Sequence, residues 1–228
     1  MFMSKAVVLL SGGLDSSTCL AIAKKAGYEV IALSFDYHQR HNIELDSAKK
    51  IAAHYNVARH IIIETNMEAI GGSALTDQNL SVPDGIVERS NVPITYVPAR
   101  NLIFLSYALS LAEATDSDKI YIGVNSIDYS GYPDCRPEFI EAFDKIVNVA
   151  TKATAVDGKN IAVETPLLNM SKKEIVTLAE ELGVPLKLTR SCYKGGQKAC
   201  GVCDSCRLRL KGFADAGYID PIEYETTP

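Results

Sequence analysis

Residues 6–17 read AVVLLSGGLDSS and join an apolar run to a glycine-containing turn, ahead of a stretch, 18–27, that we expect to be helical. The apolar run is typical of a strand that is covered on both faces of a parallel sheet. Gly12 and Gly13 allow a tight turn and a close approach of the backbone to a ligand. The start of the following helix offers unpaired N–H groups and a positive dipole end to an anion. The junction therefore predicts a phosphate site.

Serines flank this turn on both sides, at Ser11, Ser16 and Ser17, and add hydroxyl donors. The stretch matches neither the mononucleotide P-loop, which needs Gly-x4-Gly-Lys-Ser/Thr, nor the dinucleotide fingerprint, which needs Gly-x-Gly-x-x-Gly. The alternative is a plain turn in which an Asp or a Ser caps a helix. The position of the turn after the first apolar strand of an α/β chain favours nucleotide-phosphate binding.

A second cluster consists of cysteines with the spacing Cys-x7-Cys-x2-Cys-x2-Cys, at Cys192, Cys200, Cys203 and Cys206. The spacing suits four thiolates that converge on one tetrahedral ion. We favour structural zinc, because four protein sulfurs leave no ligand position for a catalytic water. A [4Fe–4S] cluster and a disulfide pair are the alternatives. Because the chain shows no secretory signal, we expect a reduced cytosol, which disfavours disulfides.

The composition is that of a soluble globular protein, with 47% apolar and 22% charged residues in a chain of 228. A chain of this length buries about 70% of its extended surface, which suffices for one substantial core. We expect a phosphate-binding α/β domain over 1–190 and a small zinc-binding segment over 191–228 that packs on it. No apolar run approaches the length of about 20 residues that spans a bilayer, so we expect no membrane partner and a cytoplasmic location.

The formal net charge of −5 provides no global basic field for DNA or RNA. A group of basic residues near the C-terminus forms either a local patch or a solvated helix face, and we favour the solvated face. This group consists of Lys194, Lys198, Arg207, Arg209 and Lys211. We therefore expect no nucleic-acid partner.

Strand-like and helix-like periodicity alternate along the chain. We expect strands over 6–10, 30–35, 59–64, 119–123 and 161–164, and helices over 18–27, 42–55, 101–115, 137–151 and 171–181. The pattern predicts an α/β fold with a doubly wound, mainly parallel five-stranded sheet and helices on both faces. The stretch 66–95 lacks periodicity and is predicted to be a long loop that closes over the site. Ligands are expected at the carboxyl ends of the strands, where the strand order reverses.

Three segments near those strand ends concentrate polar groups. Residues 36–41, DYHQRH, are either a hydrophilic loop or a nucleotide contact. Arg100, near the start of a helix, suits an anionic ligand or a structural ion pair. In 123–139, tyrosines suit stacking on a ring, carboxylates suit a guanine-like edge and an arginine suits a carboxylate, although an Asx-rich connection is the alternative. The residues concerned in this last segment are Asp128, Tyr129, Tyr132, Asp134 and Arg136.

The serine and glycine turn at 11–17 resembles the PP-loop of the ATP pyrophosphatase superfamily. Three further stretches make the resemblance specific: VPARN at 97–101, DYSGYPDCRPEF at 128–139 and the cysteine set. Together they are similar to the QueC family of 7-cyano-7-deazaguanine synthases, and the similarity covers nearly the whole chain.

The resemblance implies an ATP-dependent ligase of queuosine precursor synthesis that converts 7-carboxy-7-deazaguanine and ammonia to the 7-cyano product. Mg²⁺ is implied as the counter-ion of ATP, and the partners are small molecules. The rest of the chain has no glutaminase nucleophile arrangement, which agrees with free ammonia as the nitrogen donor. Family members tend to be dimers, so a homodimer is implied.

Residue roles follow from the same resemblance. Asp15, Ser16 and Arg100 are the expected catalytic residues, with Asp15 positioning metal or loop, and the 128–136 loop is expected to bind the deazaguanine. The expected ATP contacts are Leu10, Ser11, Gly12, Gly13, Leu14, Asp15, Ser16 and Ser17. A tRNA thiolation enzyme and a non-catalytic zinc-ribbon module are the alternatives. The net charge disfavours the first, and the second leaves most of the chain unexplained.

Overall fold

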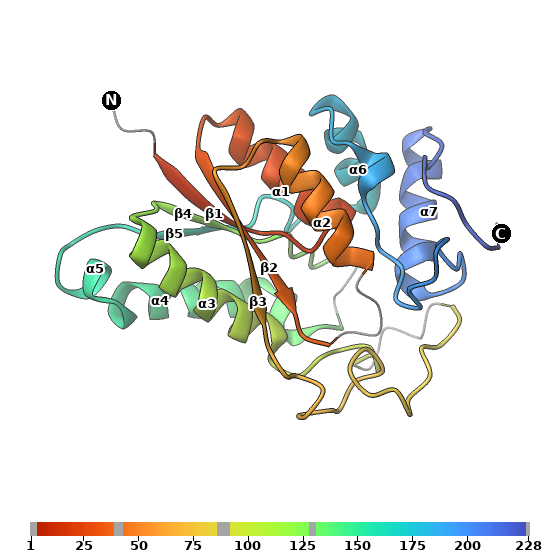
Figure 1. The fold of residues 1–228 in the computed structure, drawn as a ribbon, viewed down its shortest axis with the longest axis horizontal. Coiled ribbons are helices and arrows are strands. Elements are labelled where there is room, and N and C mark those ends of the chain that lie inside the picture. Colours follow the sequence, from red (N-terminus) through yellow and green to blue (C-terminus); the bar gives the residue numbers. More distant parts are fainter. Residues whose placement is uncertain (1–3, 39–42, 86–91, 128–130, 227–228) are drawn as a thin grey trace.

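The protein contains one all-parallel five-stranded sheet with the strand order β3-β2-β1-β4-β5, as seen in a computed structural model (Figure 1). The structure describes residues 4–38, 43–85, 92–127 and 131–226. The strands are β1 (Lys5–Leu9), β2 (Glu29–Asp36), β3 (Arg59–Glu64), β4 (Lys119–Tyr121) and β5 (Ala162–Glu164). The α-helices are α1 (Leu14–Lys25), α2 (Ile43–His54), α3 (Arg100–Thr115), α4 (Pro137–Ala150), α5 (Lys152–Ala155), α6 (Lys172–Glu181) and α7 (Asp204–Ala216). The predicted fold class is confirmed.

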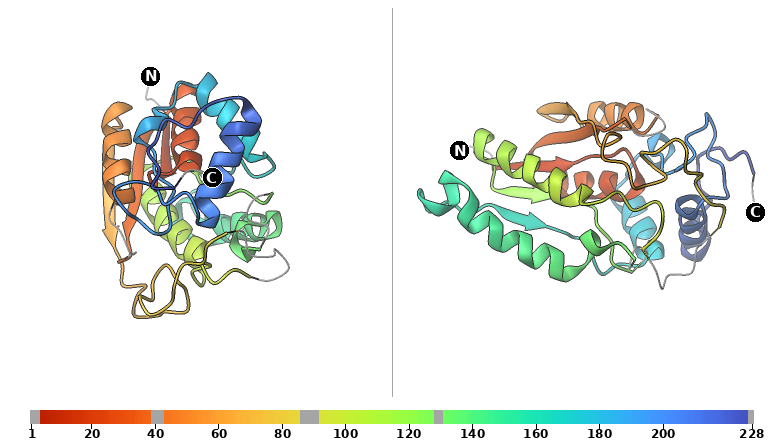
Figure 2. Two further views of the ribbon diagram at one scale, coloured as in Figure 1. Left: turned by 90° about the vertical axis from the view of Figure 1, so that its right-hand side faces the viewer. Right: turned by 90° about the horizontal axis from the view of Figure 1, so that it is seen from below.

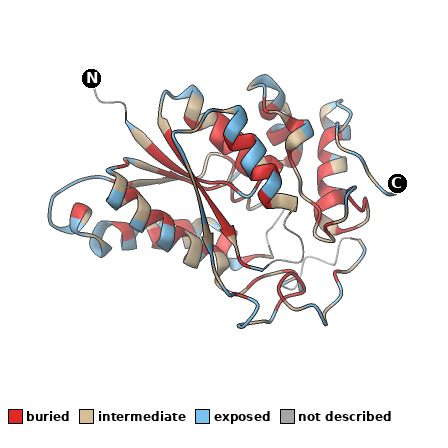
Figure 3. Cartoon of the chain, viewed as in Figure 1, coloured by how far each residue is buried: buried red, intermediate tan, exposed pale blue. Residues whose placement is uncertain are grey.

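Helices cover both faces of the sheet, because β1 is apolar on both of its sides. Val7 and Leu9 pack into a core with α3 and α4, whereas the alternate residues Ala6 and Val8 pack into a second core with α1, α2 and α6. The central strands are consequently buried along their length, and the exposed residues of β3 mark the edge of the sheet (Figure 3).

The first helix begins at Leu14, earlier than the predicted start at residue 18. The serines after the turn are compatible with a helix because their hydroxyls bond to its backbone: Ser17 Oγ donates to the carbonyl of Gly13 at 2.7 Å. Strand β4, which lies next to β1, ends at Tyr121, before the predicted end at Gly123. Two residues further on, Gly123 passes close to α1, where an added Cβ would lie 3.0 Å from the backbone nitrogen of Ser16.

Helix α6 begins as the sequence predicts. The Ser171 side chain accepts a hydrogen bond from the Glu174 N–H, and the Glu174 carboxylate accepts one from the Ser171 N–H at 2.7 Å. The Ser171 hydroxyl also donates to the Glu174 carboxylate, and the two bonds that this carboxylate accepts lower the pKa of Glu174 by stabilising its charged form. The capping box thereby fixes the start of α6 and, with it, the position of Lys172, the first residue of the helix.

The long loop has no helix or strand over 66–85 and 92–95, as predicted. It packs against the cysteine-containing segment: the Gly85 N–H donates to the carbonyl of Val202 at 2.8 Å, and Asp84 pairs with Lys194. Figure 2 shows this loop beside the segment that carries α7. None of the described residues of the loop lines the cavity treated below, so the prediction that it closes over the site gains no support from them.

Candidate functional site

A cavity of about 230 Å³ lies at the carboxyl ends of β1, β2 and β4. This is the point where the strand order reverses, with β2 on one side of β1 and β4 on the other. Such a switch point is the usual ligand site of an open parallel sheet. The cavity is lined by Leu9, Leu10, Ser11, Gly13, Leu14, Asp15, Ser16, Leu33, Phe35, Tyr37, Glu44, Leu45, Arg100, Asn101, Phe104, Ile122, Gly123, Val124, Tyr132, Cys135, Lys172, Arg190, Ser191, Tyr193, Ser205 and Arg209.

The phosphate loop, residues 11–17, is held by its own polar groups. Ser16 Oγ lies 3.0 Å from Ser11 Oγ and 3.2 Å from the carbonyl of Gly13. Gly12 has a φ of +87°, and a Cβ there would lie 2.3 Å from the carbonyl oxygen of Glu44, so only glycine fits between the turn and α2. Gly13 has a φ of −81°, which any residue can adopt, but the chain is close there too: an added Cβ would lie 3.3 Å from the carbonyl oxygen of Arg190.

Most of the predicted ATP contacts line the cavity, and Gly12 and Ser17 do not. Ser17 is fully buried, and its hydroxyl bonds to Gly13. The N–H groups of 14–16 have no intrahelical acceptor, because they belong to the first turn of α1. The loop therefore presents backbone donors and the hydroxyls of Ser11 and Ser16 at the cavity wall.

Asp15 is paired with a lysine that the sequence analysis did not single out. Lys172 Nζ lies 2.9 Å from each carboxylate oxygen of Asp15, and the lysine is buried. Its stem packs against Gly212 of α7, where a Cβ would lie 2.4 Å from Lys172 Cγ. The sequence held one indication of this pair. A lysine directly after a capping serine lies at the positive end of the helix dipole, where it is unfavourable unless an acidic partner is close.

Arg100 lines the cavity as predicted and also lies at the start of a helix, α3. Its guanidinium bonds to Tyr37, whose pKa is raised, chiefly by burial. Glu44 is close to both Arg100 and Arg190. Burial raises the pKa of Glu44 from 4.5 to about 7, against the lowering effect of the two arginines. The sequence analysis missed Glu44 and Arg190, which come from separate elements and meet only in the fold.

The segment 123–139, which we call the middle loop, contributes some of its residues to the cavity wall. Tyr132 and Cys135 line it, and Tyr132 Oη lies 2.7 Å from Thr95 Oγ1. The buried Asp134 does not line it, because its carboxylate accepts the backbone N–H of Asn101 at 3.0 Å and so caps α3. Arg136 is exposed at the N-cap of α4 and does not line the cavity either. The predicted substrate residues Asp128 and Tyr129 lie outside the described residues.

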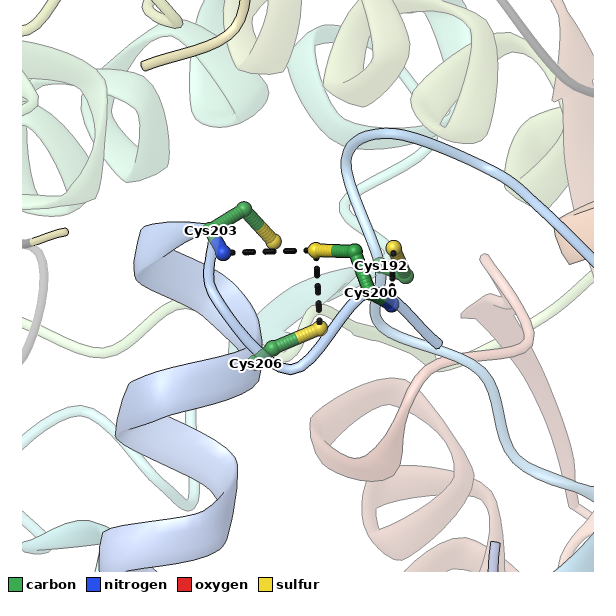
Figure 4. A group of neighbouring side chains, drawn as sticks. All are labelled: Cys192, Cys200, Cys203 and Cys206. Atoms are coloured by element: carbon green, nitrogen blue, oxygen red, sulfur yellow. Dashed lines mark hydrogen bonds between the residues drawn. The ribbon is translucent and has the colours of Figure 1, made fainter. Parts of the chain in front are cut away.

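The four predicted metal ligands, Cys192, Cys200, Cys203 and Cys206, come together as buried thiols (Figure 4). Their sulfur atoms all lie within 4.8 Å of one another. Zn–S bonds of about 2.3 Å would place tetrahedral sulfurs about 3.8 Å apart, which this arrangement fits. Backbone N–H groups of Cys200 and Cys203 each donate to a sulfur at 3.3 Å, as expected around thiolate ligands. The cluster is consistent with a zinc site.

The basic residues near the C-terminus do not form one solvated face. Arg209 is 2% exposed and pairs with Asp220 at 2.6 Å, so the favoured interpretation is wrong for this residue. The neighbouring lysines have acidic partners: the pairs are Lys194–Asp84, Lys198–Glu223 and Lys211–Asp215. These positive charges are therefore largely compensated within the chain.

A doubly wound parallel sheet with a serine and glycine phosphate loop at its switch point and a four-cysteine centre defines an α/β nucleotide-binding protein of the PP-loop class. The fold resembles that of NMN synthetase from Francisella tularensis, with a TM-score of 0.50 and 16% identity over 99% of this chain and 90% of that one. At this identity the likeness concerns the fold alone. No helix in the described ranges has the length and apolar character needed to cross a membrane.

The model of the family described as "Queuosine biosynthesis protein QueC" matches residues 5–217. The chain is 60% identical to 7-cyano-7-deazaguanine synthase 2 of Desulfitobacterium hafniense, over 97% of this chain and 94% of that protein. It is 58% identical to 7-cyano-7-deazaguanine synthase of Acetivibrio thermocellus, over 97% of this chain and 98% of that protein. The chain belongs to the QueC family.

Proposed function

We propose that this QueC-family chain is an ATP-dependent ligase that converts 7-carboxy-7-deazaguanine and ammonia to 7-cyano-7-deazaguanine in queuosine precursor biosynthesis. The observation that carries the proposal is the similarity to named synthases of this reaction over nearly the full length of both chains. The cavity at the sheet switch point supports it, since a phosphate loop and polar side chains converge there.

The chemistry explains the need for ATP. A carboxylate accepts ammonia poorly, so one of its oxygens must first become part of a phosphate-bearing leaving group. Ammonia then displaces that group and leaves an amide. A second ATP activates the amide oxygen in the same way, and loss of this oxygen together with the two N–H protons gives the nitrile. No protein nucleophile is required, so the protein binds, orients and stabilises charge.

The phosphate loop binds the ATP phosphates in this proposal. The N–H groups at the start of α1 and the hydroxyls of Ser11 and Ser16 donate to phosphate oxygens. Asp15 acts by holding Lys172 at the cavity wall, and Mg²⁺ accompanies the nucleotide as its counter-ion. Arg100 supplies a half-buried positive charge for an anionic group of either substrate.

The deazaguanine is proposed to bind beside the middle loop. Tyr132 is the described residue of that loop that combines an aromatic ring with a position at the cavity. Asp128 and Tyr129 retain their proposed roles in substrate binding. Asp134 supports the site by accepting the N–H of Asn101, the residue after Arg100, and thereby caps α3. Arg136 would have to act from the outside of the cavity, at the start of α4.

The segment 191–228 is proposed to be a zinc-binding appendage to the domain 1–190. A zinc ion held by the four cysteines is structural, because protein sulfur fills every ligand position of a tetrahedral ion. The remaining proposals are a cytoplasmic location, a homodimer and small-molecule substrates without a nucleic-acid partner. The pairing of the C-terminal basic residues with acids supports the last point, because compensated charges attract phosphate backbones weakly.

The decisive assay incubates the purified protein with ATP, Mg²⁺, ammonia and 7-carboxy-7-deazaguanine and follows the nitrile by mass spectrometry. A parallel reaction contains tRNA and a sulfur donor instead of the acid and ammonia. We expect nitrile in the first reaction and no change of tRNA in the second. Modified tRNA without turnover of the free acid would assign the chain to tRNA thiolation instead.

A further inference from the structure

Arg190 lies between the phosphate loop and the cysteine centre. Its backbone N–H donates to the carbonyl of Gly12 at 2.8 Å, and its own carbonyl oxygen lies 3.3 Å from where a Cβ of Gly13 would be. The main chain of Arg190 is thus fixed directly against the turn that carries the phosphate donors. The side chain lines the same cavity as that turn.

The guanidinium of Arg190 is anchored at one end. Nη2 donates to the carbonyls of Gly196 at 2.6 Å and Gln197 at 2.7 Å, both in the loop between Cys192 and Cys200. A guanidinium has five N–H donors, and these two bonds leave the others for further partners. Nε is buried and has no hydrogen-bond partner among the residues that the structure describes. A buried donor without a partner is unfavourable unless a ligand or water satisfies it.

The charges around the cavity also call for an anion. Four cationic side chains line it, Lys172, Arg100, Arg190 and Arg209. Arg209 is compensated by Asp220. Lys172 is compensated by Asp15. The half-buried Glu44 lies near both Arg100 and Arg190, and Arg100 also has Asp134 nearby. Glu44 is thus shared between two arginines, and an anionic ligand beside Arg190 would give this arginine a negative partner of its own.

We propose that Arg190 binds a phosphate group of ATP and that the loop between Cys192 and Cys200 orients its guanidinium for this contact. The choice of phosphate over the carboxylate of the other substrate rests on the backbone bond between Arg190 and the phosphate loop. The ligand, ATP, is taken from the function proposed above. The cysteine centre then has a direct structural connection to nucleotide binding, through two carbonyl groups and one side chain.

Calorimetry on the full-length, metal-loaded protein tests this proposal with Mg-ATP and, separately, with adenosine, which lacks phosphate. Arg190→Gln should weaken Mg-ATP binding by about 10- to 100-fold, the range for loss of a charge-assisted hydrogen bond, and leave adenosine binding unchanged. Arg190→Lys should also weaken Mg-ATP binding, because an ammonium cannot bond to both carbonyls and still reach the phosphate as the planar fork does. Arg59→Gln removes the same charge from an exposed position on β3 and should bind Mg-ATP like the wild type.

Equal Mg-ATP affinity in wild type and Arg190→Gln would overturn the proposal. So would an equal loss of Mg-ATP and adenosine affinity, which indicates a general defect of the site, or a loss confined to 7-carboxy-7-deazaguanine. Zinc content and the melting temperature show whether Arg190→Gln folds. If it does not, the Mg-ATP affinity of Arg190→Lys tests the proposal instead. A wild-type protein that binds ATP but does not convert the acid would refute the proposed function. The role of Arg190 could still be tested, because the experiment measures ATP binding and needs no turnover.

Discussion

The phosphate loop and the cysteine centre are built in opposite ways. In the loop, backbone conformation and short-range hydrogen bonds define the shape, for example from Ser16 and Ser17 to the carbonyl of Gly13. In the cysteine centre, four like side chains converge within 4.8 Å, and four thiolates so close together would repel one another without a cation to neutralise them. In the proposed functions, the loop has its shape without a ligand, whereas the centre needs a metal ion to hold its thiolates together. The two sites should therefore respond differently to substitution.

The largest effect is expected at the cysteine centre. Cys203→Ser should abolish metal binding and unfold the C-terminal segment, because binding of structural zinc supplies about 10 kcal/mol or more of folding free energy. Metal analysis and limited proteolysis measure the two consequences. The matched control is Cys19→Ala, which removes a buried thiol of α1 outside the centre and should retain the metal. Unchanged metal content in Cys203→Ser, or iron with acid-labile sulfide in the wild type, would contradict this view of the centre.

The next effect concerns the backbone of the phosphate loop. Gly12→Ala should destabilise the protein by about 2–5 kcal/mol for two reasons: an alanine would be strained in the left-handed conformation of Gly12, and its Cβ would clash with the carbonyl of Glu44. Gly27→Ala is the control: Gly27 has a φ of +86° and no atom within 4 Å of its added Cβ, so it should cost about 1–2 kcal/mol. Urea unfolding measures both. Equal losses would mean that the contact between the turn and α2 contributes nothing.

Within the loop, the two buried serines should differ in their effect on catalysis. Ser16→Ala removes a hydroxyl at the cavity and should lower kcat by about 10- to 1,000-fold with a modest loss of stability. Ser17→Ala removes a hydroxyl that bonds to Gly13 and does not line the cavity, so kcat should fall far less. Steady-state kinetics with the acid, ammonia and ATP compare them. Similar kcat values for both variants would show that the side chain of Ser16 has only a structural part.

The smallest effect is a pH dependence of stability that arises from Glu44. Its pKa is raised to about 7 in the folded protein because burial disfavours the carboxylate. Between pH 4.5 and 7 the folded state then binds more protons than the unfolded state, so this group lowers stability as pH rises and has no further effect above pH 7.

Glu44→Gln removes this titration. Relative to wild type, it should be more stable at pH 8 than at pH 5, by up to about 3 kcal/mol in the free energy of urea unfolding. Asp46→Asn, an exposed position on the same helix, is the control and should show no such change. A difference of the same size for both variants would assign the effect to surface charge.

Sequence reasoning was most successful where the chemistry is local in the chain. The phosphate loop and the cysteine set are contiguous or closely spaced, and the structure brings most of the loop residues to the cavity wall and all four cysteines together. It failed where the structure brings distant residues together. Lys172 meets Asp15 across more than half of the chain, and Asp134 caps a helix that begins well before it. No spacing rule contains such pairs, because they depend on how the helices pack on the sheet.

The same reason explains Arg190 and Arg209, which look alike as basic residues near cysteines. Both line the cavity, but Arg209 is held in a buried ion pair with Asp220, whereas the Arg190 guanidinium bonds to two backbone carbonyls. Their difference comes from the helices and loops that surround them. The basic residue types alone favoured a solvated face for Arg209, and burial decided otherwise.

The central claim is that this chain makes a nitrile from a carboxylic acid with ammonia and ATP. The most direct measurement supplies ¹⁵N-ammonia and ATP to the protein with 7-carboxy-7-deazaguanine and records the mass and ¹⁵N spectrum of the product over time. The account predicts a transient labelled amide followed by a labelled nitrile that has lost both carboxylate oxygens. Hydrolysis of ATP without label in the deazaguanine, or a labelled amide that never proceeds to the nitrile, would contradict it.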